Sequence, residues 1–201
     1  MTDTPTPGTP GTPGTRERLI AAMTDALRRR GLHGIGLTEL LAQAGAPKGV
    51  LYHHFPGGKT ELAVAAIDDV VARMLRGLDT LLAQKTDPIE ATRRWMAGAT
   101  GRLSETGFES GCPLATVALE TTPEDPALRE ALARAFATLR ERIALALEEH
   151  GERRAQAQGI AALIVATYEG GLLQARVAQS TEPITQATET LLSLLASRTA
   201  R

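Results

Sequence analysis

A short stretch near the N-terminus, residues 45–62 (GAPKGVLYHHFPGGKTEL), concentrates side chains that could bind an anion or a metal. The candidates are Lys48, Tyr52, His53, His54 and Lys59. Phenol, imidazole and ammonium groups donate hydrogen bonds to phosphate oxygens, and a lysine also reaches the guanine edge in the DNA major groove. Adjacent histidines diverge by about 100° on a helix, so they cannot chelate one metal together. The other two histidines lack partners at ligand spacing, and we expect no metal site and no cofactor.

Three helices are predicted to position this stretch. Apolar residues recur at helical spacing over 15–30, 37–44 and 47–55, with Pro47 at the first position of the third helix. The second and third helices are joined by AGAP, which predicts a helix-turn-helix whose second helix can lie in the major groove. The same spacing turns Leu51 and Phe55 inward. The outward side of the third helix then carries Lys48, Gly49, Tyr52 and His53.

The rest of the chain is predicted to form longer helices. They cover 60–84, 87–105, 113–120, a segment from TTPEDP to Gly151, 152–178 and 183–197. Asp87 is expected to cap its helix, with Glu90 as the capping-box acid. No β-branched run alternates over a useful length, so the fold class is all-α. We expect a three-helix helix-turn-helix domain at 15–62 and a larger helical ligand-binding and dimerisation domain at 63–201. The Thr/Pro/Gly repeat at 1–14 is expected to be a disordered tail.

Charge is distributed unevenly along the chain. The formal net charge is -1, yet residues 15–59 hold seven Lys/Arg against three acids, a balance of +4. A basic front and an acidic remainder suggest two roles, the first of them binding a polyanion. The single cysteine excludes an intramolecular disulfide. We find no apolar run long enough to span a bilayer, no signal peptide and no catalytic motif, so a cytoplasmic protein without enzymatic activity or membrane contact is expected.

The segment LTELLAQAGAPKGVLYHHFPGGKTEL (37–62) resembles the DNA-binding signature of the tetracycline-repressor (TetR) family. It shares the Ala-Gly turn, the Leu-Tyr-x-His-Phe run, and a Lys followed by Leu at the next helix. The later stretch GCPLATVALE (111–120) is similar to a branch that includes regulators of lincomycin-type drug resistance. The resemblance implies a homodimeric repressor that reads a palindromic double-stranded DNA operator and is released by a small-molecule effector.

The resemblance also implies roles for individual residues. Tyr52, His54 and Lys59 would contact phosphates, Thr38 would touch the backbone, and Lys48, Gly49 and His53 would face the groove. Pro47 stands where the family has Ser or Thr, which removes a phosphate donor, and Gly36 replaces the usual capping Thr. The spacing from Phe55 to Lys59 is one residue longer than is common in the family, which weakens the role of Lys59.

Large, adaptable side chains are scarce in the acidic part of the chain, residues 60–201. They are Met74, Trp95, Met96, Phe108, Phe136 and Tyr168, and the smaller Cys112 is a further candidate. These residues form either ordinary core or the lining of an effector pocket between long helices. Because few charges accompany them, an apolar or aromatic effector is expected. Cys112 has two interpretations of its own, a redox sensor or a small apolar filler.

Two interpretations of the whole chain remain open. In the first, the last two helices are apolar on more than one face and form a four-helix dimer interface, and the protein is a ligand-responsive repressor. The second is a small-molecule-binding protein or an enzyme on the same helical scaffold, without operator binding.

Overall fold

The computed structural model describes residues 14–84 and 87–199. Over these ranges the predicted all-α architecture is confirmed, with nine helices and no strand. The helices are α1 Thr15–Arg30, α2 Leu37–Gln43, α3 Lys48–His54, α4 Gly58–Leu82, α5 Pro88–Glu105, α6 Pro113–Glu120, α7 Pro126–Glu149, α8 Arg154–Ala178 and α9 Glu182–Thr199. The tail predicted at 1–14 lies outside the described residues, apart from Gly14.

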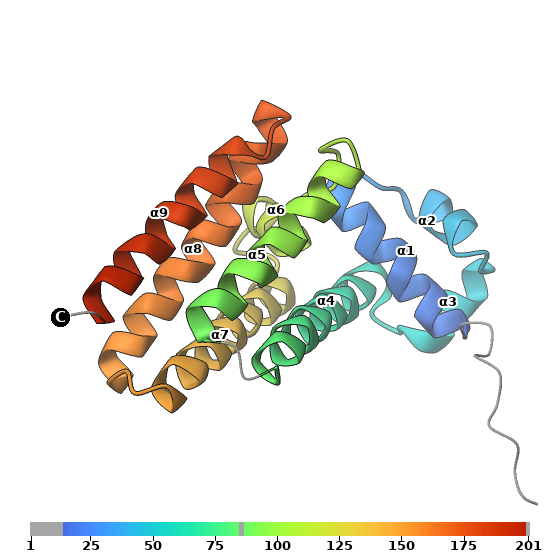
Figure 1. Ribbon diagram of the computed structural model, residues 1–201. Coiled ribbons are helices and arrows are strands. Elements are labelled where there is room, and N and C mark those ends of the chain that lie inside the picture. Colours follow the sequence, from blue (N-terminus) through green and yellow to red (C-terminus); the bar gives the residue numbers. More distant parts are fainter. Residues whose placement is uncertain (1–13, 85–86, 200–201) are drawn as a thin grey trace, which may run out of the picture.

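The first three helices form a small group at one end of the molecule (Figure 1). Helix α1 packs along the first turns of α4, and α2 and α3 lie at the outer edge of the group. Leucines spaced three or four residues apart supply its core, which is why helical periodicity alone located these elements. Leu19, Leu27, Leu40, Leu51 and Leu62 are fully buried there.

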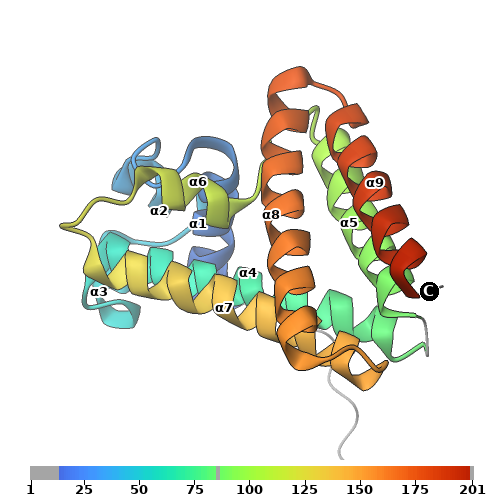
Figure 2. The ribbon, with the colours of Figure 1, turned by 90° about the vertical axis from the view of Figure 1, so that its left-hand side faces the viewer.

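Helix α4, 25 residues long, connects this group to the remainder of the chain. It packs on α1 at one end and on α5 and α7 further along. Helices α4 and α7 run side by side, and α8 and α9 stand across them with α5 (Figure 2). Helix α4 therefore contacts both the small group and the rest of the chain.

Helix α5 begins as predicted at its cap but not at its capping box. The Ile89 N–H donates to Asp87 Oδ1 at 2.7 Å, which satisfies one free amide of the first turn. Glu90 does not reach back to the cap. Its carboxylate instead pairs with the side chains of Arg93 and Arg94, at 3.1 and 2.9 Å.

Among the described helices, α8 is long and apolar enough to cross a bilayer by length and composition alone, although the sequence led us to expect no such run. Buried core helices meet the same test, however, and α8 packs against α7 and α9 with Ile164 and Leu172 buried. We therefore read α8 as the central helix of the larger domain.

Candidate functional site

The turn between α2 and α3 fixes the angle at which α3 is presented. Gly45 has φ of +58°, a left-handed conformation that favours glycine. Its N–H donates to Ala42 O at 3.1 Å and the Ala46 N–H donates to Leu41 O at 3.0 Å, the paired bonds of a Schellman helix end. Pro47 follows as the N-cap of α3 with φ of −66°, so it precedes the helix instead of occupying the first helical position.

Helix α3 has one buried side and one solvent-facing side. Leu51 and Phe55 are 0% and 1% exposed, and the guanidinium of Arg16 lies 5.3 Å from the centre of the Phe55 ring. The residues predicted to face outward are exposed, namely Lys48, Gly49, Tyr52 and His53, and so are Thr38 and Pro47. A Cβ on Gly49 would meet nothing within 4 Å, so a flat surface can approach the helix closely here.

His54 differs from its neighbours because it is half-buried. Its ring lies between those of His53 and Phe55, with centroids 5.1 and 6.5 Å away. Six of the eight predicted DNA-contact residues are thus exposed on α2, on α3 or at the start of α3, and His54 is half-buried on α3.

The eighth residue, Lys59, makes contacts within the protein. Its ammonium donates to the carbonyl oxygens of Leu32 and Ile35, both at 2.6 Å, and so ties the α1–α2 connection to the start of α4. Partial burial lowers the pKa of Lys59, and the carboxylate of Glu120 acts in the opposite direction. Two of the three N–H donors of the ammonium are thus used within the protein, so the structure favours a structural role for Lys59, and its phosphate contact stays a prediction.

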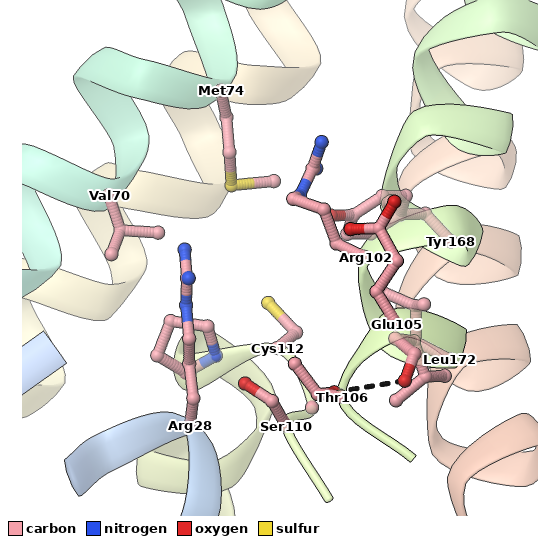
Figure 3. A pocket seen from close by; sticks show the side chains of 14 residues that line it. Arg28, Val70, Met74, Arg102, Glu105, Thr106, Ser110, Cys112, Tyr168 and Leu172 are labelled. Atoms are coloured by element: carbon pink, nitrogen blue, oxygen red, sulfur yellow. Dashed lines mark hydrogen bonds between the residues drawn. The ribbon is translucent and has the colours of Figure 1, made fainter. Parts of the chain in front are cut away.

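A cavity of ≈180 Å³ lies where α1, α4, α5 and α8 meet the segment before α6 (Figure 3). Three predicted effector residues line it, Met74, Cys112 and Tyr168. An adjoining cavity of ≈550 Å³ shares Met74 and is lined by Trp95. The Trp95 ring stacks on Tyr168 at 4.6 Å, and its Nε1–H donates to Met74 O at 3.1 Å.

The other three predicted effector residues do not line either cavity. Met96 is fully buried in the core beside α9, where the Thr188 hydroxyl contacts its sulfur at 3.9 Å. Phe108 has φ of +64° and follows the end of α5, and Phe136 packs half-buried against the core. Their size and apolar character identified them as inward-facing, and inward-facing residues are more often core than lining.

The cavity is also more highly charged than the sequence indicated. Arg28, Arg102 and Glu105 line it, so the expectation of few charges was wrong. Figure 3 shows Arg28 reaching in from α1 towards Met74, with Arg102 entering from α5. Burial lowers the pKa of Arg28, and the positive charges of Arg73 and Arg102 lower it further.

A buried thiol and carboxyl adjoin the same cavity. Cys112 Sγ donates to Glu169 Oε1 at 3.2 Å, and Glu169 Oε2 has no hydrogen-bond partner. Burial raises the pKa of Glu169 to about 7. Burial, with the nearby Glu169 carboxylate, raises the pKa of Cys112 well above its usual range, which favours the apolar-filler interpretation over redox sensing.

The C-terminal end of α1 is held by three contacts from the larger domain. The Gly111 N–H donates to Arg28 O at 3.0 Å, and the Arg176 guanidinium donates to Arg29 O at 2.8 Å. The Leu32 N–H donates to Glu120 Oε2 at 2.5 Å. The residues that line the cavity therefore belong to the same segments that hold the small helical group in place.

Comparisons with known proteins match both the N-terminal and the C-terminal parts of the chain. The family described as "Bacterial regulatory proteins, tetR family" matches residues 19–66, and "Transcriptional regulator LmrA/YxaF-like, C-terminal domain" matches 88–190. The regulator LmrA of Bacillus subtilis (strain 168) is 29% identical over 181 residues, 90% of this chain and 96% of that relative.

Solved structures share the fold. The regulatory protein TetR from Rhodobacter sphaeroides superposes with a TM-score of 0.79 at 25% identity, covering 89% of this chain and 97% of its own. A cysteine mutant of the regulator CifR, complexed with 26-bp double-strand operator DNA, gives a TM-score of 0.76 at 20% identity, with 92% and 98% covered. The exposed side of α3 and these two family matches together show that the chain belongs to the TetR family of DNA-binding transcriptional regulators, with an LmrA/YxaF-like C-terminal domain.

Proposed function

We propose that this protein is a cytoplasmic homodimeric repressor, which reads a palindromic operator with α3 of each subunit and leaves it when a small effector binds. The observation that carries the proposal is the division of α3 into two sides. Leu51 is fully buried, whereas the next residue, Tyr52, is 48% exposed. A helix that hides its leucine and displays phenol, imidazole and ammonium groups is suited to phosphate oxygens and base edges.

The contact set proposed for DNA excludes Lys59. Lys48 and His53 would face the groove, with Gly49 allowing close approach, and Tyr52 and His54 would donate to phosphates. Thr38 and Pro47 would lie against the backbone from the start of each helix. The CifR mutant, a protein of the same fold, is complexed with 26-bp operator DNA, which supports DNA binding by a chain of this fold.

A second copy of the chain is proposed to pack on α8 and α9. These helices expose the large apolar side chains of Leu163, Leu173 and Leu194, at 52%, 48% and 61%. Leu163 and Leu194 also border a groove of ≈690 Å³ between the two helices. Two such pairs would form a four-helix interface, the isologous arrangement expected of a two-fold dimer.

The effector is proposed to bind in the cavity beside Met74 and Tyr168, with an apolar or aromatic body. Ligand in this position would contact Arg28 on α1 and the segment that ends at Cys112. Helix α1 belongs to the small group of helices α1–α3, which would read the DNA. Effector binding would therefore favour a dimer whose two α3 helices no longer match major grooves about 34 Å apart.

The alternative is a small-molecule-binding protein or an enzyme without operator binding. Relatives that are named transcriptional regulators argue against it. Among the described side chains, no group of three or more His, Cys, Asp and Glu is arranged to hold a metal.

Fluorescence anisotropy with DNA from upstream of this gene and its divergent neighbour tests the proposal. We expect tight binding that weakens steeply with salt, because each phosphate contact releases counterions. Tyr52→Ala should abolish binding while circular dichroism shows a folded protein, and Leu119→Ala, an exposed residue outside α3, is the control. Absent or salt-insensitive binding by the unmodified protein would favour the alternative. A reporter under the same promoter distinguishes repression from activation.

A further inference from the structure

Two arginines in the cavity have no acidic partner. Within the described chain, the guanidinium groups of Arg28 and Arg102 take part in no ion pair. The residues that follow Arg28 behave differently. Arg29 binds Asp25 and Glu109, and Arg30 binds Glu39 at 2.6 Å.

An unpaired cation in such a place is unfavourable. A charge that leaves water is normally compensated by an opposite charge or by hydrogen bonds. Arg28 is half-buried, and burial, followed by the positive charges of Arg73 and Arg102, lowers its pKa, whereas Arg102 itself is exposed at the edge of the cavity. Arg73 already has Asp69 as its partner. An anion placed between Arg28 and Arg102 would relieve this imbalance, and a cation would worsen it.

Acidic groups near the cavity do not fill that role. Glu105 lines the cavity but is exposed, and it forms no ion pair with Arg102. Glu169 lies on the other side of Cys112 in a neighbouring cavity, where burial holds the pKa of its carboxyl at about 7. Neither carboxylate neutralises the Arg28 guanidinium.

The remaining lining is mainly apolar, with the hydroxyl residues Thr106 and Ser110 in the first cavity and Arg73, Thr80 and Arg94 in the adjoining one. Val70 and Met74 from α4 face Leu172 and the Tyr168 ring from α8 across the cavity (Figure 3). The adjoining cavity of ≈550 Å³ extends the space along Trp95. Together they fall within the roughly 300–1,000 Å³ typical of small-molecule sites, which have apolar walls and a few placed polar groups.

We propose that the effector is an organic carboxylate, whose anionic group is held by Arg28 and Arg102 and whose apolar or aromatic body packs against Met74, Val70 and Tyr168. This inference rests on the proposed effector role of the cavity and adds the chemical class of the ligand. Arg28 belongs to α1 and Arg102 to α5, so the carboxylate joins the DNA-reading group to the larger domain. Because Arg28 O also accepts from Gly111 N–H, the bound anion acts on the contact that holds the end of α1.

A matched series of probes tests the charge. Phenylacetate, phenethyl alcohol and phenethylamine share one ring and differ in the charge of the terminal group. Binding is measured by calorimetry and by quenching of Trp95, the only tryptophan in the chain, which borders the cavity. We expect phenylacetate to bind about tenfold to a hundredfold more tightly than the alcohol, as for hydrogen bonds to charged groups, and the amine to bind most weakly.

Substitutions of the two arginines test whether they cause the preference for the carboxylate. Arg28→Gln and Arg102→Gln should each remove most of the preference for the carboxylate, and Arg28→Lys should restore part of it. Arg140→Gln, an exposed arginine on α7 with the same change of charge, should keep the preference. Thermal unfolding of each variant shows whether it is folded, and no loss of stability is expected when an unpaired charge is removed.

Three results would overturn the inference. They are equal affinity for phenylacetate and the alcohol, a preference that survives in the Arg28→Gln/Arg102→Gln double variant, and no binding of phenylacetate to the unmodified protein. Equal affinity accompanied by Trp95 quenching would leave the cavity as the effector site and remove only the anion. Operator anisotropy on the same wild-type sample reports separately on the proposed repressor function.

Discussion

Replacing Lys59 by methionine separates two roles that this residue could have. In the structure its ammonium donates to Leu32 O and Ile35 O, each at 2.6 Å. Hydrogen bonds from charged groups contribute about 1.5–3 kcal/mol each, and methionine leaves both carbonyls without this donor. Because Lys59 is partly exposed, water replaces much of the loss, and we expect the free energy of unfolding to fall by about 2 kcal/mol. For a chain of this size that lowers Tm by about 4–8 °C.

Lys48→Met is the matched control for this experiment. Lys48 is exposed on α3, so its removal should change stability by less than about 0.5 kcal/mol. Because Lys48 of each subunit would bring one positive charge to the DNA and displace counterions there, its removal should flatten the slope of log Kd against log salt by about 1.8 for the dimer. Lys59→Met should leave that slope unchanged.

Thermal unfolding by circular dichroism and anisotropy titrations at several salt concentrations provide the two measurements. A Lys59→Met variant with the wild-type Tm and a flatter salt dependence would refute the reasoning. Lys59 would then be a phosphate anchor, as the family resemblance implied.

Three further predictions concern packing and titration. Gly171→Ala should destabilise by about 1–3 kcal/mol in urea, because its Cβ would lie 2.8 Å from Ile184 Cγ1 and 3.2 Å from Ile184 Cα, whereas Gly101→Ala, with nothing within 4 Å, should stabilise by about 0.5–1 kcal/mol. Burial raises the pKa of Glu169 to about 7. The contribution of Glu169 to the free energy of unfolding is therefore most favourable below its ordinary pKa near 4.5, where the side chain is protonated, and is lost as pH rises through 7 and the buried carboxyl ionises. Glu169→Gln should therefore raise Tm at about pH 8, by the equivalent of about 2–3 kcal/mol, and change it little at about pH 5; an equal gain at both values would contradict this. Cys112 is buried and its thiol pKa is raised, so at neutral pH it should react with a thiol reagent at least about tenfold more slowly than free cysteine, and a rate equal to that of free cysteine would show an accessible thiolate.

Helix positions were predictable from the sequence where the end signals are local. Helices α1 and α6 have the predicted limits because Gly31 stops the first and Pro113 starts the second. Helix α4 starts earlier than predicted, at Gly58, where the Gly57 N–H donates to Glu61 Oε2 at 2.7 Å. A side chain that reaches back four residues gives no signal in apolar periodicity.

The outward face of α3 was also predictable, because a helix buries one stripe and exposes the other.

Which residues line the cavity was less predictable from the sequence. Periodicity indicates that a side chain points inward, but whether neighbours fill the space depends on how distant helices pack. Arg28 illustrates the difficulty, since it is the first of three consecutive arginines and they point about 100° apart. Only the positions of α5 and α6 decide that Arg28 alone of the three lines the cavity.

The three contacts at the end of α1 bear on how such regulators can be recombined. Each joins the larger domain to a main-chain atom of the small one, Arg28 O, Arg29 O or the Leu32 amide. These three hydrogen bonds need no side chain of the small group. They do need glycine at position 31, where φ is +76° and a Cβ would lie 1.9 Å from Glu120 Oε1. A foreign group of three helices with the same backbone shape, grafted ahead of α4 with glycine retained at that position, would therefore keep these three hydrogen bonds. The Arg28 side chain in the cavity and the Arg29–Glu109 ion pair would have to be carried over with it for the native coupling to be kept.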